Sequence, residues 1–169
     1  MSVPLRIRSR ISLSAFRRSG PAMALALLLT ACSSAAQAVS VTMYRDPNCG
    51  CCLAWADHAH DHFRASHEDV SVETIDSDAM GAVKARLGVP ADLASCHTAV
   101  IDGYVIEGHV PAADIERLLA ERPEGVTGLS VPAMPVGSPG MEMGDRRDAY
   151  QVIAFGPGGR RIWASYSGG

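Results

Sequence analysis

The chain has 169 residues, and its 15 Lys and Arg residues and 18 Asp and Glu residues give a net charge of −3 at pH 7. Residues 1–38 contain five of the basic residues and none of the acidic ones, so the remainder carries 10 basic and 18 acidic side chains, a charge near −8. This balance argues against a nucleic-acid partner and agrees with a protein that meets cations. The roughly 130 residues that remain are enough for one compact domain with a modest core.

The N-terminus has the pattern of an export signal. Five arginines precede the apolar segment PAMALALLLTA, whose roughly 11 residues are too few to span a bilayer as a permanent helix. The small residues that end at Cys32 resemble a lipoprotein box, whereas Ala36-Gln37-Ala38 fits ordinary signal cleavage. Both patterns predict a signal peptide within residues 1–38 and an exported, periplasmic protein. Cleavage before Cys32 would add a lipid anchor, which is the only membrane attachment that we expect.

Beyond residue 38 the chain is predicted to alternate strands and helices. Alternating apolar and β-branched residues predict strands, and apolar residues at helical spacing predict helices. In chain order the predicted elements are a strand at 39–44, a helix from 51 to about 65, a strand at 69–76, a helix capped by Ser77 or Asp78 that stops at Gly88, strands at 98–101 and 104–107, and a helix from Pro111 to about 122. The Asp102-Gly103 pair predicts a hairpin turn between the strands at 98–101 and 104–107.

The last part of the chain, residues 126–169, is richer in Gly, Pro and Met. Two short strands at 150–155 and 161–165 flank a Gly-Pro-Gly-Gly turn and predict a terminal β-hairpin. The preceding order β-α-β-α-β-β-α, with cysteines between the first strand and the first helix, is the order of a thioredoxin-like fold. We therefore predict an α/β protein with a thioredoxin-like domain at 40–125 and an extension at 126–169.

Three cysteines lie within four positions in the stretch DPNCGCC. Cys49 and Cys52 form a C-x-x-C pair at a predicted helix start, where unsatisfied N–H groups and the helix dipole favour a thiolate. Such a pair suits both disulfide exchange and the binding of a soft metal. Cys51 favours the metal, because a dithiol oxidoreductase needs no third thiol, whereas Cu(I) prefers sulfur ligands. An oxidoreductase that uses Cys49 and Cys52, with Cys51 or Cys96 as the resolving thiol, stays open as an alternative.

Cys96 and His97 directly precede the predicted strand at 98–101. In a thioredoxin-type fold, the residues that enter this strand lie against the start of the cysteine-bearing helix. His97 is then expected at the position that a cis-proline usually occupies. Four sulfurs and an imidazole would converge in one pocket. The alternative for Cys96 is an inert buried cysteine.

A second tier of candidate ligands lies elsewhere in the sequence. His109 precedes the last predicted helix of the thioredoxin-like unit. The segment VPAMPVGSPGMEMG cannot form a helix, and its thioethers suit Cu(I), which predicts either a loop over the site or a packing loop; its methionines are Met134, Met141 and Met143. His58 and His62 share one face of the first helix and have the spacing of a metal pair. A polar, solvated helix face is the favoured interpretation for these two histidines.

The stretches PNCGCCLAW, SCHTAVIDGYVIEGHVP and MPVGSPGMEMG closely resemble the CopG-like family, and the resemblance runs over residues 41–144. Members of this family, long catalogued as a domain of unknown function, accompany bacterial copper- and metal-resistance operons. The resemblance implies a periplasmic thioredoxin-like protein whose cysteine cluster binds copper and is described as able to change its redox state. It places the copper site at Cys49, Cys51, Cys52, Cys96 and His97.

The sequence therefore predicts a periplasmic protein that binds copper, as Cu(I) or Cu(II), in metal resistance or homeostasis. A thiol–disulfide oxidoreductase and a chaperone that passes copper to an efflux pump or an oxidase are the alternatives. Whether the protein is an enzyme stays undecided, and a copper oxidoreductase is the form that an enzyme would take. The sequence shows no Ser-His-Asp order, phosphate loop or carboxylate pair that would support a hydrolytic site.

Overall fold

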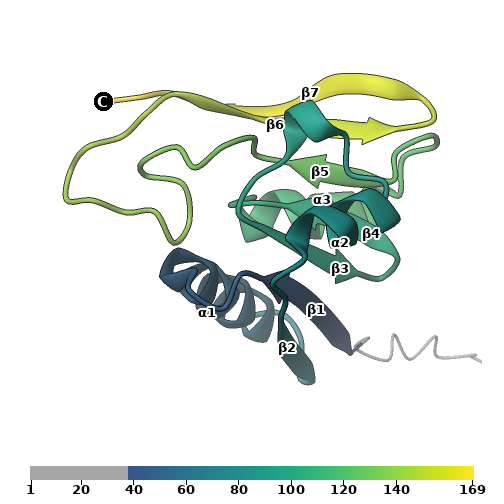
Figure 1. Cartoon of the computed structure of the whole chain (residues 1–169), viewed down its shortest axis with the longest axis horizontal. Helices are drawn as coiled ribbons and strands as arrows, with labels where there is room; N and C mark the ends of the chain where they lie inside the picture. The colour runs from purple at the N-terminus through teal and green to yellow at the C-terminus, as the bar shows by residue number, and fades with distance from the viewer. Residues whose placement is uncertain (1–37) are drawn as a thin grey trace, which may run out of the picture. The chain divides into compact units, whose positions relative to one another are not determined.

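A computed structural model describes residues 38–169 (Figure 1). Cys32 and nearly all of the predicted signal peptide lie outside these residues. The helices and strands are β1 (Val39–Arg45), α1 (Gly50–Arg64), β2 (Val70–Asp76), α2 (Met80–Arg86), the 3-10 helix η1 (Ala91–Leu93), β3 (His97–Ile101), β4 (Tyr104–Glu107), α3 (Ala112–Glu121), β5 (Gly128–Ser130), β6 (Tyr150–Gly156) and β7 (Gly159–Tyr166). This confirms the predicted α/β class. None of the helices in this part of the chain is long and apolar enough to cross a membrane.

The strands of the described residues form one sheet in the order β2-β1-β3-β4-β5-β6-β7. β1 and β2 are parallel, whereas β3 runs antiparallel to its two neighbours, β1 and β4. The order β1-α1-β2-α2-β3-β4-α3 is the one on which the thioredoxin-like prediction depends. The assignment to that fold itself stays a prediction.

The main hydrophobic core lies between one face of the sheet and the helices α1 and α3. Alternate residues of β1 point into it, and Val41 and Met43 are fully buried there with Trp55 and Phe63 of α1. A smaller apolar cluster consists of Val89, Leu93, Val105 and Phe155. Because Ile106, the next residue of β4, belongs to the main core, the smaller cluster lies on the opposite face of the sheet.

The strands β5, β6 and β7 extend the same sheet beyond β4. β5 pairs parallel to β4 and antiparallel to β6, and β6 and β7 form an antiparallel hairpin. The sequence analysis did not predict β5, which is only three residues long. Its Gly128 packs so closely between Val105 and Phe155 that a side chain there would overlap both. The chain between β5 and β6, residues 131–149, forms a long loop (Figure 1).

Helix α2 begins slightly later than the sequence predicts. Its N-cap is Ala79, and neither Ser77 nor Asp78 caps it. The Ser77 hydroxyl instead accepts a hydrogen bond from the Ala79 backbone N–H at 3.2 Å. This serine therefore stabilises the turn before the helix, a role that serine side chains often take.

Candidate metal centre

The cysteine cluster begins at the short loop between β1 and α1. Arg45 holds this loop in place. Arg45 is the last residue of β1, and its Nη1 atom donates to the backbone carbonyls of Asp46, Pro47 and Cys49 at 3.1–3.2 Å. Its Nη2 atom forms an ion pair with Asp76 at 2.9 Å. Because one buried guanidinium bonds three backbone carbonyls of this loop, the start of α1 has a fixed position relative to β1.

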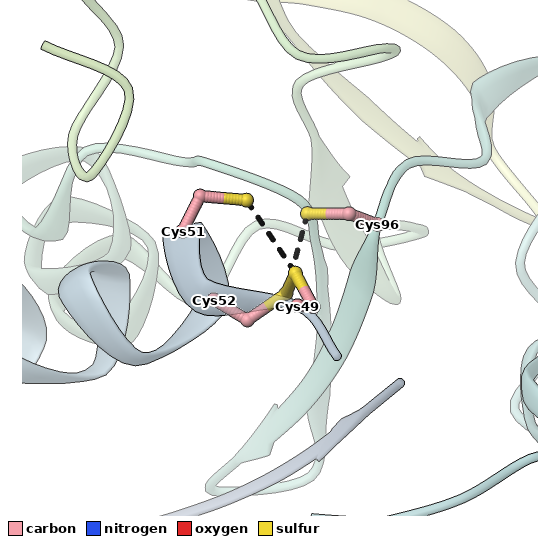
Figure 2. A group of neighbouring side chains, drawn as sticks. All are labelled: Cys49, Cys51, Cys52 and Cys96. Carbon is pink, nitrogen blue, oxygen red and sulfur yellow. Dashed lines mark hydrogen bonds between the residues drawn. A yellow bond between two sulfur atoms is a disulfide. The ribbon is translucent and has the colours of Figure 1, made fainter. Parts of the chain in front are cut away.

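The pairing of β1 with β3 brings Cys96, the fourth cysteine of the cluster, close to the start of α1. Arg45 pairs with His97 across β1 and β3, so the chain that enters β3 lies beside the end of β1. Cys96 therefore lies next to the cysteines of α1, as the sequence analysis expected. Figure 2 shows the Cys96 side chain pointing from the chain before β3 toward the first turn of α1.

The four sulfurs of the cluster lie side by side (Figure 2). Cys49 and Cys52 form a disulfide, and Cys51 and Cys96 are free thiols. The Sγ atom of Cys51 lies 3.4 Å from that of Cys49, and the Sγ atom of Cys96 lies 3.6 Å from that of Cys52. Each end of the disulfide thus has a free thiol beside it. Cys52 is fully buried, and the other three cysteines are partly exposed.

Cys96 also belongs to a second group of metal-ligand atoms, together with His97 and His109. Its Sγ atom lies 3.2 Å from His97 Nδ1 and 3.0 Å from His109 Nε2. Both imidazoles are fully buried, and the His97 ring packs 4.5 Å from the ring of Trp55, measured between centroids. Within each group the ligand atoms all lie within 4.8 Å of one another. The two groups share Cys96, which makes this sulfur the centre of the site.

The hydrogen bond at Nδ1 of His109 determines the tautomer of this imidazole and so the state of the nitrogen that faces the Cys96 sulfur. His109 Nδ1 lies 2.8 Å from the backbone carbonyl oxygen of Pro139, and a carbonyl oxygen can only accept. Nδ1 therefore carries the proton, and Nε2 presents its lone pair to Cys96. An imidazole held in this way by a carbonyl is the usual arrangement of a metal-ligating histidine. His97 Nε2, by contrast, is buried and has no hydrogen-bond partner among the described residues.

The protonation states in the metal-free site follow from burial. Burial, followed by the neighbouring Cys51, raises the pKa of Cys96 to about 12. Burial holds the pKa of His97 well below its usual value, and it also lowers the pKa of His109. The site therefore contains a protonated thiol and two neutral imidazoles near neutral pH. A metal ion that binds Cys96 has to displace its proton.

The loop at residues 131–149 reaches the site through Pro139 and Gly140. Pro139 contacts His109, as described above, and is buried. Gly140 has a φ of +82°, and a Cβ atom there would lie 2.7 Å from the backbone nitrogen of Trp55 and 2.9 Å from the carbonyl oxygen of Cys51. The loop backbone therefore lies directly on the first turns of α1.

The three methionines of the loop occupy different environments. Met134 and Met143 are 49% and 60% exposed. Met134 lines a separate open hollow with Tyr150 and Tyr166, and Met141 is partly buried, with its backbone N–H donating to the Ser138 carbonyl at 2.8 Å. The predicted role of these thioethers as copper ligands stays a prediction.

Two of the three histidines of α1, His58 and His62, take part in helix packing. His58 Nε2 accepts the backbone N–H of Ala112 at 3.2 Å, at the start of α3. His62 Nε2 lies 2.9 Å from Glu116 Oε2 in α3. Each histidine thus uses its Nε2 atom for a contact with α3. Both are half-buried polar side chains, and they do not belong to a ligand group of three or more among the described residues.

Sequence reasoning missed two charged residues beside the site, Arg45 and Glu107. Arg45 had a signal, because it continues the inward-facing series of Val39, Val41 and Met43 at a position where another apolar residue is expected. Glu107 ends the apolar strand β4 and is fully buried. A charge at the end of an apolar strand was the available sign, although nothing in the sequence identifies its partner, Lys84.

Comparison with known proteins gives a family and two structural relatives. A family model described as "Protein of unknown function, DUF411" matches residues 93–141. A solved structure titled "Copper resistance protein copG- Form 2" is 46% identical, with a TM-score of 0.68, and the match covers 77% of this chain and 99% of that chain. A second, titled "Copper resistance protein copG- Form 1", is 47% identical with the same TM-score, over 78% and 100% of the two chains. No curated protein sequence matches.

Proposed function

Because this chain belongs to the CopG-like family of copper resistance proteins, we propose that it binds copper through the cysteine cluster and acts in copper resistance or homeostasis. The observation that carries the proposal is the convergence of three cysteine sulfurs and two buried imidazoles around Cys96. Thiolate sulfur is a soft ligand that selects Cu(I), and imidazole accepts copper in both oxidation states. The ligands we propose are Cys49, Cys51, Cys52, Cys96, His97 and His109, with Met134, Met141 and Met143 as further candidates.

The Cys49–Cys52 disulfide supports a redox role in addition to binding. When both thiols are reduced, they hold two electrons that two Cu(II) ions can accept. Each Cu(II) gains one electron and becomes Cu(I), the two sulfurs lose one electron each and bond to one another, and two protons are released. Cys51 and Cys96 stay free in the oxidised state, so thiol ligands for the Cu(I) product are still present beside the disulfide. A copper oxidoreductase is the enzymatic form of the proposal.

A thiol–disulfide oxidoreductase is the second candidate. One observation favours it: Cys96 Sγ lies 3.6 Å from Cys52 Sγ, within reach for a resolving thiol. The state of Cys96 argues against it, because burial raises the pKa of this thiol to about 12, and exchange requires a thiolate. The copper chaperone alternative depends on the exposed thioethers of Met134 and Met143 and on a copper efflux or oxidase partner.

We place the protein in the periplasm on the basis of the export signal predicted within residues 1–38, and a lipid anchor at Cys32 belongs to the same proposal. The relatives named as copper resistance proteins support a role that handles copper ions. Labelling with a radioactive fatty acid tests the anchor, since Cys32→Ser would abolish the label. Export itself is tested by recovery of the chain in the periplasmic fraction.

The decisive experiment is a copper titration of the reduced full chain without oxygen. A Cu(I) chelator competes for the metal, and free thiols are counted on the same sample. We expect more than one Cu(I) per chain, because the four thiols form one ligand group and Cys96 forms a second with the two imidazoles. The control is a chain in which Cys49, Cys51, Cys52 and Cys96 are all replaced by serine. A reduced wild-type chain that takes up no Cu(I) would overturn the proposal.

A further inference from the structure

The carboxylate of Glu107 is fully buried at the end of β4 and is surrounded by hydrogen-bond donors. Its Oε1 atom accepts from Lys84 Nζ at 2.5 Å and from the backbone N–H of Ser95 at 2.6 Å. Its Oε2 atom accepts from the Thr98 hydroxyl at 2.6 Å. Lys84 Nζ also donates to Thr98 Oγ1 at 3.0 Å, which closes the network. Three separate parts of the chain are thus joined at one side chain.

Two of these contacts bracket the Cys96–His97 dipeptide. Ser95 immediately precedes the dipeptide and Thr98 immediately follows it. β3 begins at His97, so Cys96 lies before the part of the chain that the sheet ladder holds. On the side of Cys96 that precedes β3, the Ser95 N–H bond to Glu107 holds the chain together with the hydrogen bond that the Ser95 hydroxyl donates to the Ala133 carbonyl. Glu107 therefore holds the chain on both sides of Cys96, the residue that the two ligand groups share.

Lys84 makes the buried position of Glu107 possible. A carboxylate withdrawn from water without a compensating charge is strongly unfavourable. The Lys84 side chain is only 13% exposed, and it reaches the carboxylate from α2. The ion pair thus ties α2 to the chain that enters β3.

We propose that Glu107, held by Lys84, is a positioning residue of the metal centre and keeps Cys96 Sγ beside Cys52 Sγ. The importance of this role rests on the proposed copper function. The positioning of Cys96 Sγ beside Cys52 Sγ does not rest on the copper function, because the closeness of the two sulfurs is measurable without copper. Neither residue touches the metal ligands' sulfur or imidazole atoms through the contacts described above; both act through Ser95 and Thr98.

The test measures how readily Cys52 and Cys96 form a disulfide with one another. In the full chain, Cys32→Ser, Cys49→Ser and Cys51→Ser leave these two as the only thiols. The parent is reduced and then oxidised with diamide, and the loss of free thiol is followed with time. Because the sulfurs lie 3.6 Å apart, the parent forms an intramolecular disulfide, and its rate is the reference for the variants. Adding Glu107→Gln slows this step on the order of tenfold or more, since a small displacement of reacting groups costs a large part of their proximity.

Two further variants make the result decisive. Asp114→Asn is the matched control, because Asp114 is a nearly buried carboxylate that bonds Tyr166 and Arg117 instead of the chain before β3. Its oxidation rate stays within about twofold of the parent, as expected for an independent site. Thr98→Val keeps the Lys84–Glu107 ion pair and the Ser95 contact, and it removes only the hydrogen bonds of the Thr98 hydroxyl. It therefore slows oxidation less than Glu107→Gln does. Far-UV circular dichroism confirms the fold of each variant.

The outcomes separate this inference from the proposed function. Slow oxidation in Glu107→Gln with a parent-like rate in Asp114→Asn supports the positioning role. Equal rates in all variants overturn it. If Glu107→Gln does not fold, Thr98→Val decides, and a parent-like rate in that variant overturns the inference. A wild-type chain that takes up no Cu(I) overturns the copper function, while the oxidation rates still report on Glu107.

Discussion

The Nε2 atom of His109 lies 3.0 Å from the Sγ atom of Cys96, although the two residues are 13 positions apart. The β3–β4 hairpin causes this closeness. Its register pairs Ile101 with Tyr104 and Thr98 with Glu107, so two further steps along both chains place Cys96 opposite His109. The Pro139 carbonyl then orients the imidazole, and the lone pair of Nε2 faces the sulfur. Cys96 and His109 thus already lie side by side in the metal-free chain.

His109→Asn tests this pair. The asparagine amide group can retain a donor near the Pro139 carbonyl, but it removes the Nε2 ligand. We expect the Cu(I) affinity of the reduced chain to fall by about tenfold or more, because the loss of even an outer-shell partner of a metal ligand has an effect of that size. Competition with a Cu(I) chelator measures the affinity, and thermal unfolding shows whether the fold is retained. An unchanged affinity in a folded variant would remove His109 from the site.

Cys51→Ser distinguishes copper binding from disulfide chemistry. A serine hydroxyl is a poor ligand for Cu(I), so we expect the copper capacity to fall. The Cys49–Cys52 disulfide does not involve Cys51 and should still form. Activity in a disulfide-reduction assay should therefore stay close to that of the wild type. Retained copper capacity together with unchanged reductase activity would favour the oxidoreductase alternative, which uses Cys49 and Cys52.

Cys96→Ser provides a graded comparison with Cys51→Ser. Cys96 belongs to both ligand groups, whereas Cys51 belongs to one. We therefore expect Cys96→Ser to lower the Cu(I) stoichiometry more than Cys51→Ser does when both are titrated under the same conditions. Equal losses would show that the histidine group does not contribute to copper binding.

The stability of the metal-free chain should fall in mild acid. Burial lowers the pKa of His58, His97 and His109 in the folded state below the usual value of 6.5. The unfolded chain takes up protons at these residues first, so their contribution is fully present above about pH 6.5 and is lost as the pH falls toward the folded-state pKa values. Urea unfolding of the reduced chain between about pH 7.5 and pH 5 measures this loss. A stability that rises over this interval would contradict the prediction.

His58→Gln isolates one part of the acid effect. His58 Nε2 accepts the Ala112 N–H, and a glutamine carbonyl oxygen can accept the same hydrogen bond without titrating. The variant should therefore lose stability less steeply between about pH 7.5 and pH 5 than the wild type. Its stability at neutral pH should change little.

Much of the site follows from patterns that are local in the sequence. The turn at Asp102-Gly103 was predicted, and its hairpin register alone is enough to place His109 beside Cys96. His109 was a second-tier candidate, because its place just before a predicted helix does not by itself indicate a contact with Cys96. The C-x-x-C motif and the chain before β3 were predicted to converge, and the structure brings Cys49, Cys51, Cys52, Cys96 and His97 together.

The parts that could not be predicted depend on contacts between distant segments. The buried Lys84–Glu107 pair joins α2 to β4, and charged residues are almost always assigned to the surface when only the sequence is known. Strand β5 has three residues, too few for a period to be recognised. The loop at 131–149 has no regular pattern, so its contact with α1 through Gly140 became visible only in the folded chain.

Gly140→Ala tests whether this loop supports the metal centre. A Cβ atom at Gly140 would lie 2.7 Å from the Trp55 nitrogen, and a helix backbone cannot move aside, so the loop must lift and draw the Pro139 carbonyl away from His109. We expect a loss of about 1–3 kcal/mol in stability, as for a strained backbone, and a weaker affinity for Cu(I). Gly144→Ala is the matched control, because Gly144 also has a positive φ, +60°, but has no atom within 4 Å of its Cβ position. That variant should lose some stability through strain alone and keep its copper affinity. If both variants bind copper as the wild type does, the loop only packs on α1, and the orientation of His109 does not depend on it.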